Sequence, residues 1–293
     1  MNVIQKNKPK NVFLLTLTSV IVSVLFSVLG APFLRALSVT AKSKVFWTAG
    51  ILLVIALLVM GMTLPSVYIG ALWMTLGTYS ELEKRGVSWK RAGLFALTSG
   101  VVFAAALLVL LTRFLAEQNL ISDLLQPLQT AMNKAFPEEP IEISMLANYL
   151  PGIFAATLFM ALALGFILES KINQMFHIQR TRVASGLRWL EFRLPDAFIW
   201  VSLFAAFFSL VSFDQALVQK VALNIAIVSS VAFFFQGIVV AEFMTRAFRV
   251  GPIAKTILYV FLFFQVAPAL ILVGLIDYWV DFRKKMRKKI KAN

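Results

Sequence analysis

Residues 92–111 read AGLFALTSGVVFAAALLVLL, an apolar stretch without a single charged side chain. A helix of about 20 apolar residues crosses the roughly 30 Å hydrocarbon core of a bilayer. Residues 13–29 and 221–241 are similarly apolar, and hydrophobic residues make up 60% of the 293-residue chain against 14% charged residues. This composition predicts a multi-pass helical membrane protein rather than a soluble domain.

We expect an all-α fold, a polytopic transmembrane bundle of about 7–9 membrane helices, some of them short or broken by proline. Residues 46–79 form one apolar tract that is interrupted at Leu64-Pro65. Residues 253–282 form another, with Pro268 at its middle. Broken helices are tolerated in membranes where protein packs around them or where they line a cavity.

The chain is expected to form a single integral membrane domain over residues 1–293, with a basic N-tail at 1–11 and a basic C-tail at 283–293. Residues 116–147 differ, because they are acidic and their apolar residues recur at three- and four-residue spacing. That spacing predicts an amphipathic helix, kinked at Pro127, that lies on the extracytoplasmic surface.

Charge placement predicts the topology through the positive-inside rule. If every tract is a simple span, eight spans result, with 13 Lys and Arg inside and 15 outside. If residues 46–79 cross once and residues 253–282 fold back at Pro268, 22 lie inside and 6 outside. We favour the second arrangement, in a bacterial inner (cytoplasmic) membrane, with both termini cytoplasmic. A basic turn at 81–91 fits it, with Gly86 ending one helix and Ser88 capping the next.

The sequence contains no enzyme signature: no P-loop, no zinc-protease motif and no nucleophile elbow. It has no Cys and one His, so we expect no metal site and no cofactor. His177 lies in a basic loop and is expected to be a solvated histidine. The net charge of +14 lies in loops and tails, which predicts contact with anionic lipids and not with nucleic acid.

A few polar residues interrupt the apolar tracts: Asn224, Gln236 and Gln265. Hydrogen bonds between helices explain such residues most simply, and a binding site for a small molecule is the alternative. Glu242 and Arg246 have the spacing of an ion pair on one helix.

Asp277 and Asp281 lie one helical turn apart, directly before the basic tail. We expect them to pair with Lys284 and Lys285 at the membrane interface, and a proton-coupling role is the alternative.

Two stripes of small residues predict close helix contacts. One consists of Ser19, Ser23, Ser27 and Ala31, and the other of Ala92, Ala96, Gly100 and Ala104. Packing inside the chain is one interpretation, and docking to another membrane subunit is the other, for which the first stripe is the candidate partner interface.

Several short motifs together resemble one family. They are EKRGVSW at 83–89, NYLP at 148–151, RLP at 193–195, Asn224 with Gln236-Gly237, GLID at 274–277 and DFR at 281–283. In this order they resemble the YybS-like bacterial membrane proteins of unknown function. That family is similar to the substrate-binding subunits of energy-coupling-factor transporters and to MreD-type cell-shape proteins. The resemblance implies docking through a small-residue stripe on the first helix, although this chain has Ser where those subunits usually have Ala.

The sequence therefore predicts a non-enzymatic inner-membrane protein that binds or helps to translocate a small molecule of unknown identity. The binding cavity is expected at midplane, near Pro65 and Pro268. The protein is expected to act alone or as a subunit of a larger transporter. The alternative is a membrane scaffold for cell-envelope machinery.

Overall fold

The computed structural model describes residues 9–114, 120–135, 142–178, 190, 192–211, 216–264 and 267–285. Over these residues every regular element is a helix and no strand occurs, so the predicted all-α fold is confirmed. Contacts divide the chain into two compact units, residues 1–185 and 186–293. Each unit is described by itself, and the single membrane domain stays a prediction.

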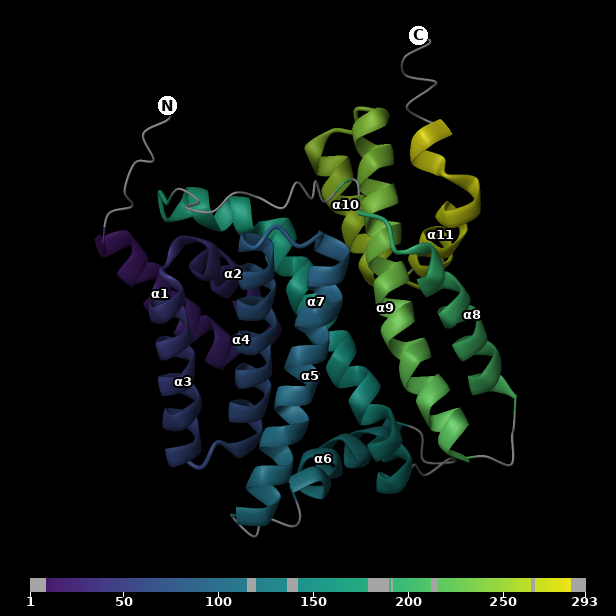
Figure 1. The fold of residues 1–293 in the computed structure, drawn as a ribbon. Coiled ribbons are helices and arrows are strands. Elements are labelled where there is room, and N and C mark those ends of the chain that lie inside the picture. The colour runs from purple at the N-terminus through teal and green to yellow at the C-terminus, as the bar shows by residue number, and fades with distance from the viewer. Residues whose placement is uncertain are drawn as a thin grey trace. The chain divides into compact units, whose positions relative to one another are not determined.

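Unit 1 contains helices α1 to α7 (Figure 1). Their bounds are α1 Pro9–Phe26, the short 3-10 turn η1 Ser27–Gly30, α2 Ala31–Thr40, α3 Ser43–Val59, α4 Thr63–Lys84, α5 Trp89–Phe114, α6 Leu120–Ala135 and α7 Ile143–Met175.

Helices α3 and α4 form an antiparallel hairpin (Figure 1). Trp73 on α4 donates a hydrogen bond from its indole nitrogen to the Phe46 carbonyl at 2.9 Å. Gly70, nearer the start of α4, lies against Val54, nearer the end of α3. The break lies at residues 60–62 and not at Pro65, because proline is accommodated in the first turn of α4. The hairpin returns the chain to the end where it started, which corrects the expectation of one net crossing.

The first apolar tract bends sharply between α1 and α2. Ser27 has a left-handed φ of 43°, and Gly30 packs directly against Ser23. In a straight helix these two residues would be about 10 Å apart along the axis. Within the apolar stretch 13–29, helix α1 therefore ends at Phe26, and α2 packs back against α1.

Helix α4 ends in the turn that the sequence predicts. Gly86 has a φ of 76°, and its N–H donates to the Glu83 carbonyl at 3.0 Å. The Val87 N–H donates to the Leu82 carbonyl at 3.1 Å. These two bonds form a Schellman motif, in which the left-handed position favours glycine. Helix α5 begins directly after Ser88, as expected.

The second small-residue stripe packs α5 against α4. Ala92 and Ala96 are fully buried and Ala104 is nearly so. A Cβ on Gly100 would overlap the Thr75 hydroxyl. The packing interpretation of this stripe is therefore confirmed.

Helix α6 confirms that a helix forms in this segment, and it continues through Pro127. Its extracytoplasmic location stays a prediction. Residues 115–119 and 136–141, which carry part of the predicted acidic charge, lie outside the described residues. Helix α7 has 33 residues, about 50 Å at 1.5 Å per residue, which is longer than the roughly 30 Å hydrocarbon core.

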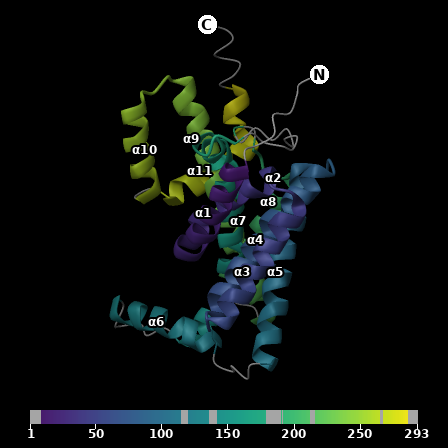
Figure 2. The same ribbon diagram turned by 90° about the vertical axis from the view of Figure 1, so that its left-hand side faces the viewer.

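Unit 2 contains α8 Asp196–Leu210, α9 Ala216–Ala247, α10 Pro252–Phe264 and α11 Ala267–Val280. Helices α8 and α9 run antiparallel, since Ser202 donates a hydrogen bond to Ser229 at 2.9 Å while Phe198 contacts Phe233. Helices α10 and α11 meet at an angle of 99° (Figure 2). Pro268 is the second residue of α11, so the prediction of two short helices in this tract is confirmed.

The exposed surface has the character of a membrane protein. Among the described residues, four helical stretches are long and apolar enough to cross a bilayer, or up to five if the bent pair α10–α11 counts as one span. One of the four, Lys10–Thr40, includes the bend at Ser27, and the others are Trp89–Arg113, Ile143–Met175 and Ala216–Ala247. Helices α3 and α8 are shorter apolar helices. Large apolar side chains such as Leu52, Leu94 and Phe204 are exposed on several helices, which would be unfavourable in water. The protein is a multi-pass helical membrane protein, and the number of about 7–9 membrane helices stays a prediction.

Candidate functional site

Arg35 on α2 is completely buried and bonds to two other helices of unit 1. Its Nη2 donates to Glu83 Oε2 on α4 at 2.7 Å, and its Nε donates to Glu169 Oε2 on α7 at 3.1 Å. Its Nη1 donates to the Ser80 hydroxyl at 2.8 Å. One guanidinium therefore ties α2, α4 and α7 together.

Two aromatic rings lie against the same guanidinium. Its carbon lies 4.8 Å from the Phe166 ring centre and 5.1 Å from that of Tyr79. A cation near ring faces is stabilised by their quadrupoles, more so away from water. We call Arg35, Tyr79, Ser80, Glu83, Phe166 and Glu169 the Arg35 cluster.

Local sequence explains why the arginine fits between these helices. Gly165 on α7 lies against the Arg35 side chain, where an added Cβ would be 3.2 Å from Arg35 Cβ. The missing side chain leaves room for the arginine stem. Glu83 lies in the last turn of α4, directly before the turn at Gly86. The cluster therefore lies toward the end of unit 1 at which α4 ends.

Buried ion pairs are weak contributors to stability, because desolvation offsets their attraction. Ionisable side chains among membrane helices often mark ion or substrate pathways instead. The two carboxylates differ, since the Glu83 side chain is 2% exposed and that of Glu169 is 11% exposed. The arrangement can hold three helices in one state, and it can respond to a change of charge at Glu169.

Sequence reasoning missed this site, although a signal was present. Arg35 follows an apolar tract of about 20 residues, and Glu169 ends another. The rule that intramembrane charges deserve attention would have selected both. Glu83 was grouped with the basic turn instead.

The predicted ligand residues Gln236 and Asn224 make different kinds of hydrogen bond. Gln236 is fully buried; its Oε1 accepts the Leu194 N–H at 3.0 Å, and its Nε2 donates to the Gly274 carbonyl at 2.8 Å. Asn224 is half-buried and donates to the Lys220 carbonyl on its own helix at 2.8 Å. Gln265 lies outside the described residues. Gln236 therefore serves helix packing, which was the simpler of the two interpretations.

The predicted partner interface lies mostly inside unit 1. Ser19, Ser23 and Ala31 are fully buried, and the Ser19 hydroxyl donates to the Leu15 carbonyl at 2.6 Å. Ser27 is exposed, but it occupies the bend and not a helical face. The stripe is internal because α2 folds back onto α1, so these three residues are not available to a partner.

The acidic residues near the end of α11 pair differently from the prediction. Asp277 accepts a bond from Arg283 at 2.7 Å, and Asp281 lies 3.5 Å from Arg193. The expected side-chain partners Lys284 and Lys285 are both exposed. The turn after α11 directs Arg283 inward, where it also donates to the Phe192 carbonyl.

Glu242 and Arg246 form the expected ion pair at 2.7 Å, and Lys255 reaches the same carboxylate at 2.7 Å. His177 is exposed, with Nδ1 2.9 Å from the Gln174 carbonyl.

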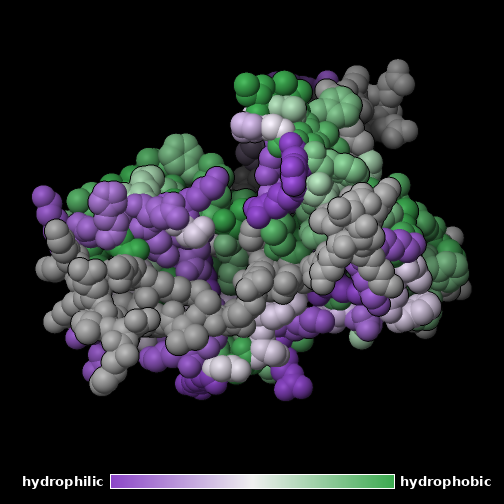
Figure 3. Space-filling model, turned by 90° about the horizontal axis from the view of Figure 1, so that it is seen from above, coloured by the Kyte–Doolittle hydropathy of each residue, from purple (hydrophilic) through white to green (hydrophobic). Residues whose placement is uncertain are grey.

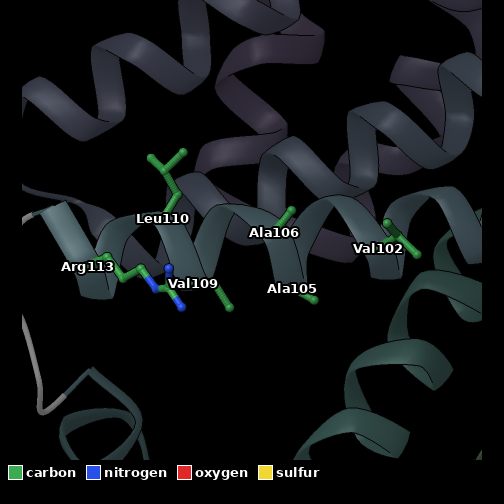
Figure 4. Close-up of a pocket in the computed structure, with 6 residues that line it drawn as sticks. All are labelled: Val102, Ala105, Ala106, Val109, Leu110 and Arg113. Carbon is green, nitrogen blue, oxygen red and sulfur yellow. The ribbon is translucent and has the colours of Figure 1, made fainter.

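An open hollow of about 590 Å³ lies on α5, lined by Val102, Ala105, Ala106, Val109, Leu110 and Arg113 (Figure 4). All six side chains come from this one helix, and five of them are apolar. A small-molecule site needs several polar groups that converge from different elements. The hollow lacks that arrangement, and Pro65, near which the sequence predicts a cavity, is not among the residues that line it.

Residues 138–278 match a family described as "Predicted membrane protein (DUF2232)". The matched region includes Glu169, Gln236 and Gly274, whereas Arg35 and Glu83 precede it. No curated protein and no solved structure matches the chain. The chain is thus similar, over residues 138–278, to an uncharacterised family of membrane proteins.

Proposed function

We propose that the protein binds a small molecule and helps to move it across the bacterial inner membrane, as a subunit of a larger transporter. The Arg35 cluster is the observation that supports this proposal. Charged groups are costly inside apolar helices, and they persist where ions or substrates pass. Arg35 contacts both α4 and α7, so a change of charge at the cluster alters how three helices hold together.

In this proposal, the contact between Glu169 and Arg35 is the one that breaks and forms again. The Glu169 contact with Arg35 is longer than the Glu83 contact, 3.1 Å against 2.7 Å, and its side chain is more exposed. A ligand cation that binds Glu169 competes with Arg35 and weakens the link between α7 and α2, while the link to α4 remains.

Purification of the tagged chain in a gentle detergent tests the proposal. Wild type and Glu169→Gln are compared, and mass spectrometry identifies the retained metabolites and co-purified proteins. We expect wild type to retain a metabolite or an ATP-hydrolysing subunit that the variant loses. Glu81→Gln is the matched control, because Glu81 bonds to Ser43 outside the cluster. Identical retention by all three proteins contradicts a role for the cluster.

A membrane scaffold for envelope machinery is the second candidate. It is favoured by Gln236, whose side chain is used for packing rather than directed into a cavity. Recovery of envelope or cell-wall proteins without any retained metabolite supports the scaffold and counts against transport.

The same proposal places the basic turn after α4 in the cytoplasm. The chain has no Cys, so single cysteines can be introduced without a background. Met60 lies in the α3–α4 turn and Lys90 at the start of α5, directly after the turn at the other end of α4, and both are exposed. A membrane-impermeant maleimide should label Met60→Cys in intact cells, and Lys90→Cys only after permeabilisation. The reverse pattern contradicts this orientation.

A further inference from the structure

Six exposed cationic side chains gather where three helix ends of unit 1 meet. They lie at the α2–α3 junction, at the end of α4 and at the start of α5. We call them the basic rim: Lys42, Lys44, Lys84, Arg85, Lys90 and Arg91.

Two contacts hold these helix ends together. The Ser43 hydroxyl donates to Glu81 Oε1 at 2.6 Å, which joins the start of α3 to the end of α4. The Schellman turn at Gly86 then places the start of α5 directly beside the end of α4. The rim is therefore one contiguous surface and not three separate loops.

Acidic residues at this end are directed inward. Glu83 is buried against Arg35, and Glu81 bonds to Ser43 and lies 3.8 Å from Lys84. Both carboxylates are engaged within unit 1, which leaves a net positive outer surface along the rim.

The rim borders an apolar lateral surface. Leu94 is 67% exposed and Phe95 is 58% exposed, one turn beyond Arg91 on the same helix. Trp47 and Trp89 are half-buried at the boundary, and the Lys90 Nζ lies 5.7 Å from the Trp89 ring centre. Tryptophan and lysine at such a boundary mark the level of lipid headgroups. Figure 3 looks onto this end and shows hydrophilic side chains next to hydrophobic ones.

We propose that the basic rim binds the headgroups of anionic phospholipids, with the acyl chains lying against Leu94 and Phe95. A nucleic acid or a soluble acidic protein would not need an apolar surface one turn away. A phospholipid needs both, because its phosphate and its acyl chain are adjacent. Each cation near a membrane surface strengthens binding of an anionic lipid by about fivefold at most, less where salt screens it.

Nanodiscs of phosphatidylcholine with about 20% phosphatidylglycerol test the proposal at a physiological anionic content. The full chain is reconstituted and released gently, and native mass spectrometry counts the retained lipids of each type. Lys90→Gln/Arg91→Gln removes two rim charges. Arg113→Gln/Lys134→Gln is the matched control, because it removes two exposed charges far along α5 and on α6.

We expect wild type and the control to be enriched in phosphatidylglycerol and the rim variant to lose several-fold of that enrichment. Raising the ionic strength should lower the enrichment of wild type toward that of the rim variant. Equal enrichment in all three proteins, or an equal loss in the control, overturns the proposal. So does a rim variant that keeps its phosphatidylglycerol but loses a co-purified protein, since the rim would then serve a protein partner. Equal melting temperatures establish that the variants are folded.

Discussion

Helices α2, α4 and α7 of unit 1 are linked by different means from the helix pair α9 and α11 of unit 2. In unit 1 the buried charge of Arg35 links α2 to α4 and α7. In unit 2, α9 and α11 approach backbone to backbone, since a Cβ on Gly237 would overlap the Leu270 carbonyl and one on Gly274 the Phe233 carbonyl. In lipid, helices gain little from apolar burial, so hydrogen bonds and close packing associate them.

This contrast indicates where the protein is able to change shape. A link made of ionised groups weakens when a carboxylate is protonated or finds another partner. A glycine contact between two backbones contains no ionised group, so neither protonation nor a competing charged partner weakens it. We therefore expect conformational change in unit 1, around the Arg35 cluster, and a fixed α9–α11 pair in unit 2.

Removal of the charge in unit 1 should have the largest effect. Arg35→Ala leaves Glu83 and Glu169 without their shared cation, and loss of one partner from a buried ion pair costs about 3–5 kcal/mol. Unfolding of wild type and variant in increasing concentrations of dodecyl sulfate measures the free energy of unfolding. Arg91→Ala, on the exposed rim, is the control and should change it by less than about 0.5 kcal/mol. A small effect of Arg35→Ala would show that the cluster does not hold unit 1 together.

Disruption of the glycine contact between α9 and α11 in unit 2 should have the second-largest effect on the free energy of unfolding. Gly274→Ala forces α11 away from α9, and overpacking of this kind costs about 1–3 kcal/mol. The same unfolding measurement applies. Gly93→Ala on α5 is the matched control, because nothing lies within 4 Å of its added Cβ. If both alanines are tolerated equally, the close approach of the two backbones is not required.

A third substitution separates packing from ligand binding at Gln236. Gln236→Leu leaves the Leu194 N–H and the Gly274 carbonyl without this partner, which costs about 1–3 kcal/mol for buried groups. Asn224→Leu should cost less, because its bond to Lys220 lies within one helix. Thermal unfolding of both variants measures the difference. A stable Gln236→Leu that loses a bound metabolite would instead revive the ligand-binding interpretation.

The smallest effect is expected at the α4–α5 turn. Gly86→Ala must adopt a left-handed φ near 76°, which costs about 1 kcal/mol for a residue with a Cβ. Gly86→Asn should recover part of it, since asparagine tolerates this region better. The melting temperatures of Gly86→Ala and Gly86→Asn, each compared with wild type, measure the loss and the recovery of stability. Equal melting of Gly86→Ala and wild type would mean that the turn relaxes.

Local signals in the sequence predicted much of the helical architecture. Gly86 and Ser88 ended and began the expected helices, because these signals act within a few residues. The two short helices around Pro268 followed from the helix-breaking property of proline. Pro65 and Pro268 both lie in the first turn of the helix that follows, as third residue of α4 and second residue of α11, because proline is accepted there. The rule therefore located each break to within a few residues and not at the proline itself.

The candidate site could not be derived in the same way. Arg35 and Glu169 are 134 residues apart, and no local pattern states that they meet. The Ser19–Ser23 stripe was recognised as a contact face, but its partner depended on the bend at Ser27. A serine carries no strong signal for a left-handed turn, so sequence alone could not tell an internal stripe from an external one.

The long separation between Arg35 and Glu169 also constrains how the protein is made. Glu83 follows Arg35 after 48 residues and Glu169 after 134. At about 5–20 residues per second, Glu169 leaves the ribosome roughly 7–27 s after Arg35. During that interval the arginine has at most one of its two carboxylates. Assembly of unit 1 is therefore completed only after α7 has been synthesised.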